Sequence, residues 1–171
     1  IYSGDLICVK SDDKLTKYTP NHICVARIDE NSEYKYMLYL MKKDEYFRIG
    51  IAPIWSVNKQ SFNANRTKQE NCEKFWVLDV YKNRMDAYLD EQYYSLIYKI
   101  PQMIFTHRQQ KGNITQKIID DFYSRFSKDD MLSNAIELLG LFHRSYDFPL
   151  WIKGGGLYFS KTHMLGRQFL I

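Results

Sequence analysis

Short runs of apolar residues dominate the first half of the chain, whereas apolar residues recur at helical spacing in the second half. Residues 34–41 and 46–51 are apolar and aromatic runs on either side of a charged segment, and residues 76–81 form a third such run. Runs of this length and composition are typical of strands, and the short polar connection indicates a hairpin. Residues 4–28 contain two further β-branched runs, which predict an N-terminal β-hairpin or meander.

Three helices are predicted from capping residues and from apolar spacings of three and four. Asn83 can cap the first helix, Asn113 or Thr115 can begin the second, and Ser127 opens the third. The pattern therefore predicts an α/β (α+β) fold. We expect a small three-stranded, mostly antiparallel sheet flanked by helices, with an N-terminal β-hairpin over residues 1–29, a core over residues 30–105 and a C-terminal helical and β extension over residues 106–171.

Composition sets limits on the class of protein. The fourteen tyrosines exceed what a core of this size needs, so some are expected to line a wet surface or a cleft. The net charge of +4 is compatible with a polyanionic partner. Three cysteines without a CxxC pair indicate neither a zinc site nor a disulfide framework. With no signal peptide and no apolar run of about 20 residues, we expect an intracellular, cytoplasmic protein that has no membrane partner and is a fragment of a longer chain.

The predicted hairpin of residues 34–51 contains the first candidate catalytic residues. Because strand residues alternate sides, Tyr46, Arg48 and Gly50 share one face of the second strand, and Tyr39 projects from the facing strand. If the hairpin closes in register, phenol and guanidinium groups meet. Hydrolysis of a phosphodiester needs a positioned water, positive charge near the developing phosphorane, and a metal at the departing oxygen. Tyrosine, arginine and glutamate can supply these.

In order and spacing, these residues resemble the GIY-YIG nucleases, whose two motifs lie on adjacent strands. Met37-Leu38-Tyr39 stands where the first motif would be, and Arg48-Ile49-Gly50 where the second would be. The resemblance covers about residues 34–105. This chain departs from the family at three positions: Met37 replaces a glycine, Arg48 replaces a tyrosine, and Glu70 stands where many members have a histidine.

The resemblance implies a role for each matched residue. Tyr39 would position or deprotonate the attacking water, and Tyr46 would stand in for the missing second tyrosine. Arg66 would neutralise the phosphorane, and Glu91 would hold one divalent cation, Mg²⁺ or Mn²⁺. Asn113 is the candidate for the late asparagine of many members.

The ends of the chain resemble pieces of the Hint fold of inteins. Thr19 and His22 have the spacing of a threonine and histidine that precede a strand in that fold, and a return strand is expected within residues 163–171. A convincing N-terminal nucleophile and the C-terminal His-Asn signature are both missing. The resemblance implies an intein-associated endonuclease with truncated splicing elements.

Double-stranded DNA is the expected partner, because basic residues gather outside the predicted core and phosphate contacts position a protein on a duplex. The candidate DNA-binding residues are Arg108, Lys111, Lys117, Lys153, Lys161 and Arg167. Most surface cations contact only solvent, and the triple glycine near residue 155 is either a phosphate contact or a flexible turn.

The sequence therefore predicts a divalent-metal-dependent DNA endonuclease of the homing (intein-associated) or restriction type. Its candidate catalytic residues are Tyr39, Tyr46, Arg48, Arg66 and Glu91, with Glu91 as the metal ligand. The alternative is a non-catalytic DNA-binding or Hint-type autoprocessing module. Taken singly, a strand tyrosine more often packs in a core, and the charged residues more often lie in solvent.

Overall fold

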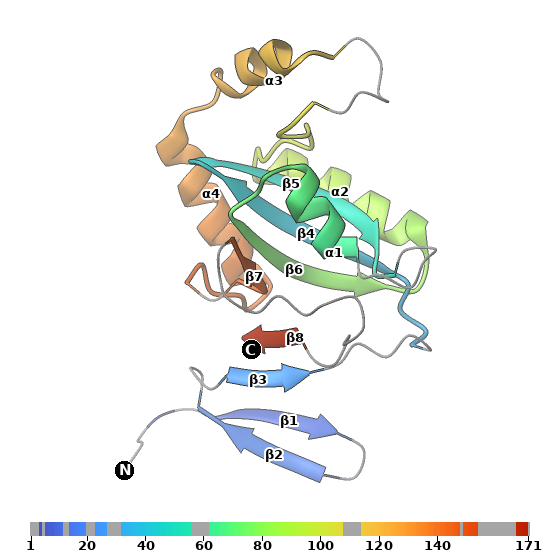
Figure 1. Cartoon of the computed structure of the whole chain (residues 1–171). Helices are drawn as coiled ribbons and strands as arrows, with labels where there is room; N and C mark the ends of the chain where they lie inside the picture. The colour runs from blue at the N-terminus through green and yellow to red at the C-terminus, as the bar shows by residue number, and fades with distance from the viewer. Residues whose placement is uncertain are drawn as a thin grey trace. The chain divides into compact units, whose positions relative to one another are not determined.

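The computed structural model describes residues 4, 6–11, 14–19, 23–26, 32–55, 62–107, 114–147, 149–153 and 167–170. The chain divides into two compact units. One contains Ile1–Ile28 together with Leu157–Ile171, and the other contains Asp29–Gly156 (Figure 1). Within the described residues, no helix is both long and apolar enough to span a bilayer.

The first unit contains elements from both ends of the chain. Strands β1 (Ile7–Ser11) and β2 (Lys14–Tyr18) form an antiparallel hairpin, so the predicted N-terminal hairpin is present. Strand β3 (Ile23–Ala26) pairs antiparallel with β8 (Arg167–Leu170). The pairing of β3 with β8 joins segments that stand on either side of the second unit in the sequence.

The second unit has the predicted antiparallel sheet at its centre. Strand β4 (Tyr36–Lys43) lies between β5 (Tyr46–Pro53) and β6 (Lys74–Tyr81), and the two-residue strand β7 (Trp151–Ile152) pairs with the outer edge of β6. The three long strands confirm the predicted α+β class with a three-stranded sheet. β7 is a short addition supplied by the C-terminal extension.

Four helices belong to this unit: α1 (Phe62–Gln69), α2 (Arg84–Ile97), α3 (Gln116–Tyr123) and α4 (Lys128–Leu141). The predicted caps of the last three helices are confirmed. Asn83, Thr115 and Ser127 each accept a hydrogen bond from the backbone N–H three residues later. Such a bond satisfies one of the N–H groups that the first turn of a helix leaves without a partner.

Packing covers the central strand on both of its faces, because every residue from 37 to 41 is buried. On one face Tyr39 stacks on Phe75 of β6, with ring centroids 5.0 Å apart. On the other face Trp76 stacks on Tyr146 and donates a hydrogen bond to the carbonyl of Ser145. Helix α2 packs along β4, β5 and β6 (Figure 1). The sheet is thus a rigid base for polar side chains on its flanks.

Candidate active site

The site is built around the pairing of Tyr39 with Gly50 in the β4–β5 hairpin. A Cβ atom added to Gly50 would collide with the Tyr39 ring and hydroxyl group. The glycine is therefore required because the tyrosine ring lies across it. Tyr39 is only 1% exposed, and the guanidinium carbon of Arg48 lies 5.8 Å from the ring centroid. The predicted meeting of phenol and guanidinium on one face is present.

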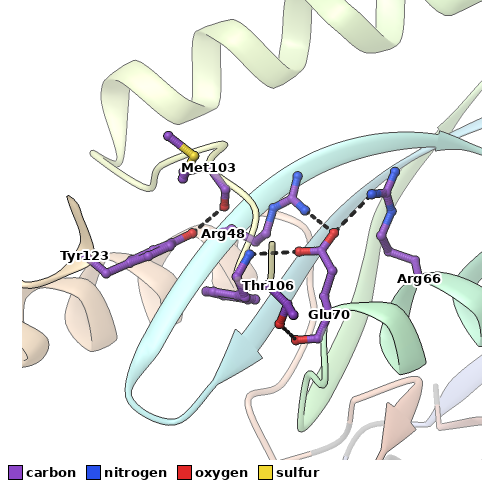
Figure 2. Close-up of polar contacts among 7 residues, drawn as sticks. Arg48, Arg66, Glu70, Met103, Thr106 and Tyr123 are labelled. Carbon is purple, nitrogen blue, oxygen red and sulfur yellow. Dashed lines mark hydrogen bonds and ion pairs between the residues drawn. The ribbon is translucent and has the colours of Figure 1, made fainter. Parts of the chain in front are cut away.

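Arg48 and Arg66 converge on one oxygen of Glu70 (Figure 2). Arg48 Nη1 lies 2.5 Å from Glu70 Oε1, and Arg66 Nη1 lies 3.1 Å from the same atom. The Glu70 side chain is fully buried, and Arg48 is 6% exposed. Charge-assisted bonds of this kind are stronger than neutral ones, and burial removes the screening by water. The three side chains form what we call the Glu70 triad.

The segment after α2 fixes the other polar atoms of Glu70. The backbone N–H of Phe105 donates to Glu70 Oε2 at 3.1 Å, and the Thr106 hydroxyl donates to the Glu70 carbonyl at 3.0 Å. Burial alone would raise the pKa of Glu70, but Arg48 and the Phe105 N–H outweigh burial, and Arg66 adds to them, so its pKa is lowered. Glu70 is therefore ionised at neutral pH and held at both carboxylate oxygens.

Glu91 approaches the same strand from α2. It lies on the buried face of that helix with Ala87, and its carboxylate accepts a hydrogen bond from the backbone N–H of Ile51. Two residues earlier on β5, the N–H of Ile49 donates to the Pro101 carbonyl at 3.1 Å. Because alternate N–H groups of an edge strand point outward, Glu91 and the segment after α2 together cover the open edge of β5 beside Gly50.

Burial raises the pKa of Glu91, and Arg48, the Ile51 N–H and Arg84 oppose this rise only in part. No ion pair to Glu91 is found among the described residues. A buried carboxylate that is only partly compensated is favourable for binding a cation, since the cation would offset the cost of desolvation.

Electrostatic effects connect Tyr39 to all four charged groups. Burial raises the pKa of the Tyr39 phenol, Arg48 and Arg66 lower it, and Glu70 and Glu91 raise it further, with a net rise. Arg48 and Arg66 carry two positive charges, and Glu70 and Glu91 carry up to two negative charges. The site is thus close to electrically balanced, and the phenol is neutral at pH 7.

The structure does not bring Tyr46 into this group. Tyr46 pairs with Lys43 at the other end of the hairpin, next to the turn, whereas Tyr39 pairs with Gly50. Its ring lies 5.3 Å from that of Tyr123 on α3, and the Lys128 ammonium lies 5.9 Å from its centroid. Tyr39, Arg48, Arg66 and Glu91 are therefore the predicted catalytic residues that come together.

The predicted DNA-binding residues fall into three groups. Lys117 is exposed on the first turn of α3, and Lys153 donates to Asn71 Oδ1 at 2.8 Å on the same unit. Arg167 belongs to β8 of the other unit. The residues that lie outside the described part of the chain are Arg108, Lys111 and Lys161, together with His22 and Asn113.

Three residues near the site were not among the predicted functional residues. Glu70 is the centre of the triad, Arg84 lies close enough to Glu91 to lower its pKa, and Tyr123 donates to the Met103 carbonyl at 2.5 Å beside the triad (Figure 2). The sequence carried a signal for Glu70, because its spacing of four from Arg66 places both on one side of a helix. Tyr123 is 77 positions after Tyr46, and no local pattern connects them.

The side chains at the site favour a hard cation that keeps several water ligands over a cation whose ligands all come from the protein. The described residues contain no cluster of three or more histidine, cysteine, aspartate or glutamate side chains that could hold a metal ion. Of the two carboxylates described at the site, Glu70 is already held by two arginines and the Phe105 N–H, so Glu91 is the one that would provide an oxygen to a cation. Mg²⁺ commonly binds through one or two carboxylates and keeps several waters, so the residues fit this ion.

Comparison of the chain with protein-family models, curated proteins and solved structures finds no match. The resemblance to the GIY-YIG nucleases therefore depends on the order and spacing of the quoted residues alone.

Proposed function

We propose that the chain is a divalent-metal-dependent endonuclease that hydrolyses phosphodiester bonds of double-stranded DNA. The observation that carries this proposal is the convergence of Tyr39, Arg66 and Glu91, which come from β4, α1 and α2. Both charged groups lie close enough to the phenol to shift its pKa. Side chains of these three types, from residues up to 52 positions apart in the sequence, match the needs of phosphodiester hydrolysis.

In the proposed reaction, a water oxygen attacks phosphorus and the bond from phosphorus to one ester oxygen breaks. The departing oxygen gains one proton of the water and leaves as a hydroxyl group, and the other proton stays on the phosphate monoester or passes to solvent. Tyr39 has a raised pKa, so its neutral phenol orients the water by hydrogen bonding and does not remove the proton. Arg66 is always charged and balances the negative charge of the phosphorane. Glu91 would hold Mg²⁺ or Mn²⁺, which when bound supplies Lewis-acid stabilisation of the departing oxygen.

Cleavage of supercoiled plasmid in Mg²⁺ tests this proposal. We expect nicked or linear product from the wild type, and a rate at least about 100-fold lower for Glu91→Ala, since metal and electrostatic stabilisation contribute effects of this size. Glu137→Ala is the matched control, because Glu137 is exposed on α4, and it should cleave at the wild-type rate. A wild type that cleaves no DNA in Mg²⁺ or Mn²⁺, or a Glu91→Ala variant of full activity, would refute the proposal.

The rival candidate is a non-catalytic DNA-binding module, and the burial of Tyr39 is the observation that favours it. At 1% exposure, and stacked on Phe75, this tyrosine has the surroundings of a packing residue. Tyr39→Phe separates the candidates, because it keeps the ring and removes only the hydroxyl. The nuclease predicts loss of cleavage with an unchanged melting temperature, whereas a packing role leaves any cleavage intact. Tyr34→Phe, at an exposed tyrosine, is the control.

The homing type is favoured by the first unit. Its strands β3 and β8 stand on either side of the second unit in the sequence and pair with each other. This arrangement is expected of a nuclease inserted into a Hint fold. Mapping of cut positions on a large plasmid distinguishes the types, since a homing enzyme cuts at one long site and a restriction enzyme cuts wherever a short sequence recurs.

DNA binding is proposed to depend on exposed cations of the second unit, including Lys117 and Lys153. Each phosphate neutralised by a lysine releases counterions, and log K falls with log salt by about 0.9 per contact. Replacing Lys117 by alanine should lower that slope by about one. If the DNA affinity of the wild type did not change with salt concentration, the proposed lysine–phosphate contacts would be wrong.

A further inference from the structure

We propose that Glu70 is a positioning residue of the cleavage site, which anchors Arg66 and Arg48 on one carboxylate oxygen so that both cations face the reacting phosphate. This inference rests on the proposed nuclease function and deepens it. It assigns a role to a glutamate that the predicted catalytic set does not contain. It also gives Arg48 a role as a second cation beside Tyr39.

The anchoring of Glu70 is the first step of the inference. Both of its carboxylate oxygens are bound, because Oε1 accepts from two guanidinium groups and Oε2 accepts from the Phe105 N–H. The backbone of the same residue is held by the Thr106 hydroxyl. A carboxylate fixed from α1, β5 and the segment after α2 sets the position of anything bound to it.

The second step concerns what Glu70 holds. Arginine has a long side chain with several rotatable bonds, and a cation aids a reaction most when its position is fixed before the reaction begins. Arg66 is tied to Glu70 across one helical turn and keeps a side chain that is 16% exposed. It is therefore anchored at one end and still accessible to a phosphate. Arg48 is buried beside the Tyr39 ring.

The third step is that two departures from the GIY-YIG pattern contact each other. Arg48 stands where the family has a tyrosine, and Glu70 where many members have a histidine, and the two are joined at 2.5 Å. A buried arginine at the first position requires an acidic partner, since an isolated buried charge is very costly. Arg48 and Glu70 therefore act as one pair, which stays charged at neutral pH.

Contrast with the surface supports a specific role for this pair. The other ion pairs that the described residues contain include Lys82 with Glu33 and Lys128 with Glu45, each with side chains more than half exposed. Exposed pairs of this kind do little for stability or geometry. The triad is the place where charged side chains are removed from water and aligned toward the candidate water-positioning tyrosine.

Steady-state cleavage kinetics of Glu70→Gln test the inference. We expect kcat to fall about 100-fold while KM for DNA stays within about threefold, because the exposed cations that bind the duplex are unchanged. Glu73→Gln is the matched control, at a partly exposed glutamate three residues away that pairs with Lys42, and it should have wild-type kinetics.

A second variant separates positioning from folding, since loss of one partner from a buried pair can unfold the domain. Arg48→Met combined with Glu70→Met replaces the pair by apolar side chains that need no partner. Arg66 and the Phe105 N–H also lose their acceptor, so we expect this double variant to melt below the wild type but above Glu70→Gln, and still to lose about 100-fold in kcat. A folded double variant with wild-type kcat would overturn the inference.

A double-mutant cycle tests whether Glu70 acts through Arg66. In an Arg66→Ala background, Glu70→Gln should lower kcat by less than it does in the wild type, because only the positioning of Arg48 is left to lose, whereas independent roles would multiply the two losses. Such multiplied losses would overturn the proposed mechanism of positioning. If the wild type cleaves DNA and Glu91→Ala does not, but Glu70→Gln cleaves at the wild-type rate, the inference fails and the nuclease function stands. If the wild type does not cleave at all, both fail.

Discussion

Two buried glutamates contact the same strand, β5, in opposite electrostatic surroundings. Glu70 follows α1 and is held by two arginines and a backbone N–H, so its pKa is lowered. Glu91 lies on α2 and accepts from the Ile51 N–H, but burial outweighs its favourable contacts and its pKa is raised. A glutamate side chain is thus stabilised in its ionised form at position 70, whereas at position 91 of the same site burial disfavours the ionised form.

This difference indicates how tasks are divided within the site. A carboxylate whose charge is already matched is suited to holding other groups in place. One whose charge is only partly matched is suited to binding an added cation. Candidate functional groups are often found where environments push the pKa values of like residues apart. The comparison is the basis on which we propose positioning by Glu70 and cation binding by Glu91.

The largest expected effect is the loss of stability in Glu70→Gln. Neutralising this side chain leaves Arg48 buried without its anionic partner, and removal of one partner of a buried pair typically costs about 3–5 kcal/mol. Urea unfolding followed by circular dichroism measures the change. A loss of less than about 1 kcal/mol in the free energy of unfolding would mean that water reaches the pair. The charge of Glu70 would then be no better compensated than that of Glu91.

A smaller loss is expected for Gly50→Ala, which alters β5, the strand that both glutamates contact. The added methyl group would collide with the Tyr39 ring, and overpacking of this kind typically costs about 1–3 kcal/mol. The matched control is the double variant Gly50→Ala with Tyr39→Ala, in which the smaller side chain leaves space for the methyl group. The cost of adding the methyl group should be lower in the Tyr39→Ala background than in the wild type. An equal cost in both would show that the ring is not the cause.

Local signals predicted much of this fold from the sequence. The three long strands are marked by apolar runs, and the helix caps at Asn83, Thr115 and Ser127 are short-range patterns that need no tertiary information. The pairing of β3 with β8 could not be deduced in the same way, because register between distant strands depends on packing across the whole chain.

Prediction of the site was limited in the same way, because local patterns identify residues but not the contacts between residues far apart in the sequence. Tyr39, Arg66 and Glu91 follow from motif order, and the structure brings them together. Alternation places Tyr46 on the face of Arg48 and predicts that it stands in for the missing second tyrosine, but alternation does not say which end of a hairpin is near the glutamates. The role of Glu70 depends on its burial and on its contact with Arg48, which is 22 residues away in sequence.

Glu91→Gln is expected to have a stability effect opposite in sign to that of Glu70→Gln. A neutral amide of the same shape avoids the cost of burying a carboxylate that is only partly compensated. In EDTA at pH 7, the urea midpoint of this variant should equal or exceed that of the wild type, while cleavage in Mg²⁺ is lost. A clear loss of stability would show that Glu91 is held by contacts as favourable as those of Glu70.

The smallest and most specific effect is expected in how the stability changes of Glu70→Gln and Glu91→Gln depend on pH. Each change is measured in EDTA as the urea midpoint of the variant relative to that of the wild type. Glu70 has a pKa below its ordinary value of 4.5 in the folded state, so the stability it contributes is fully present above pH 4.5 and is lost only as pH falls through the lower folded-state value. Glu91 has a folded-state pKa above 4.5, so its cost is present at neutral pH and is relieved as pH falls toward 4.5. The deficit of Glu70→Gln should therefore persist down to about pH 4.5, whereas any advantage of Glu91→Gln should already have disappeared there. If both differences disappeared over one pH range, the two glutamates would share one environment, and the division of tasks between them would be wrong.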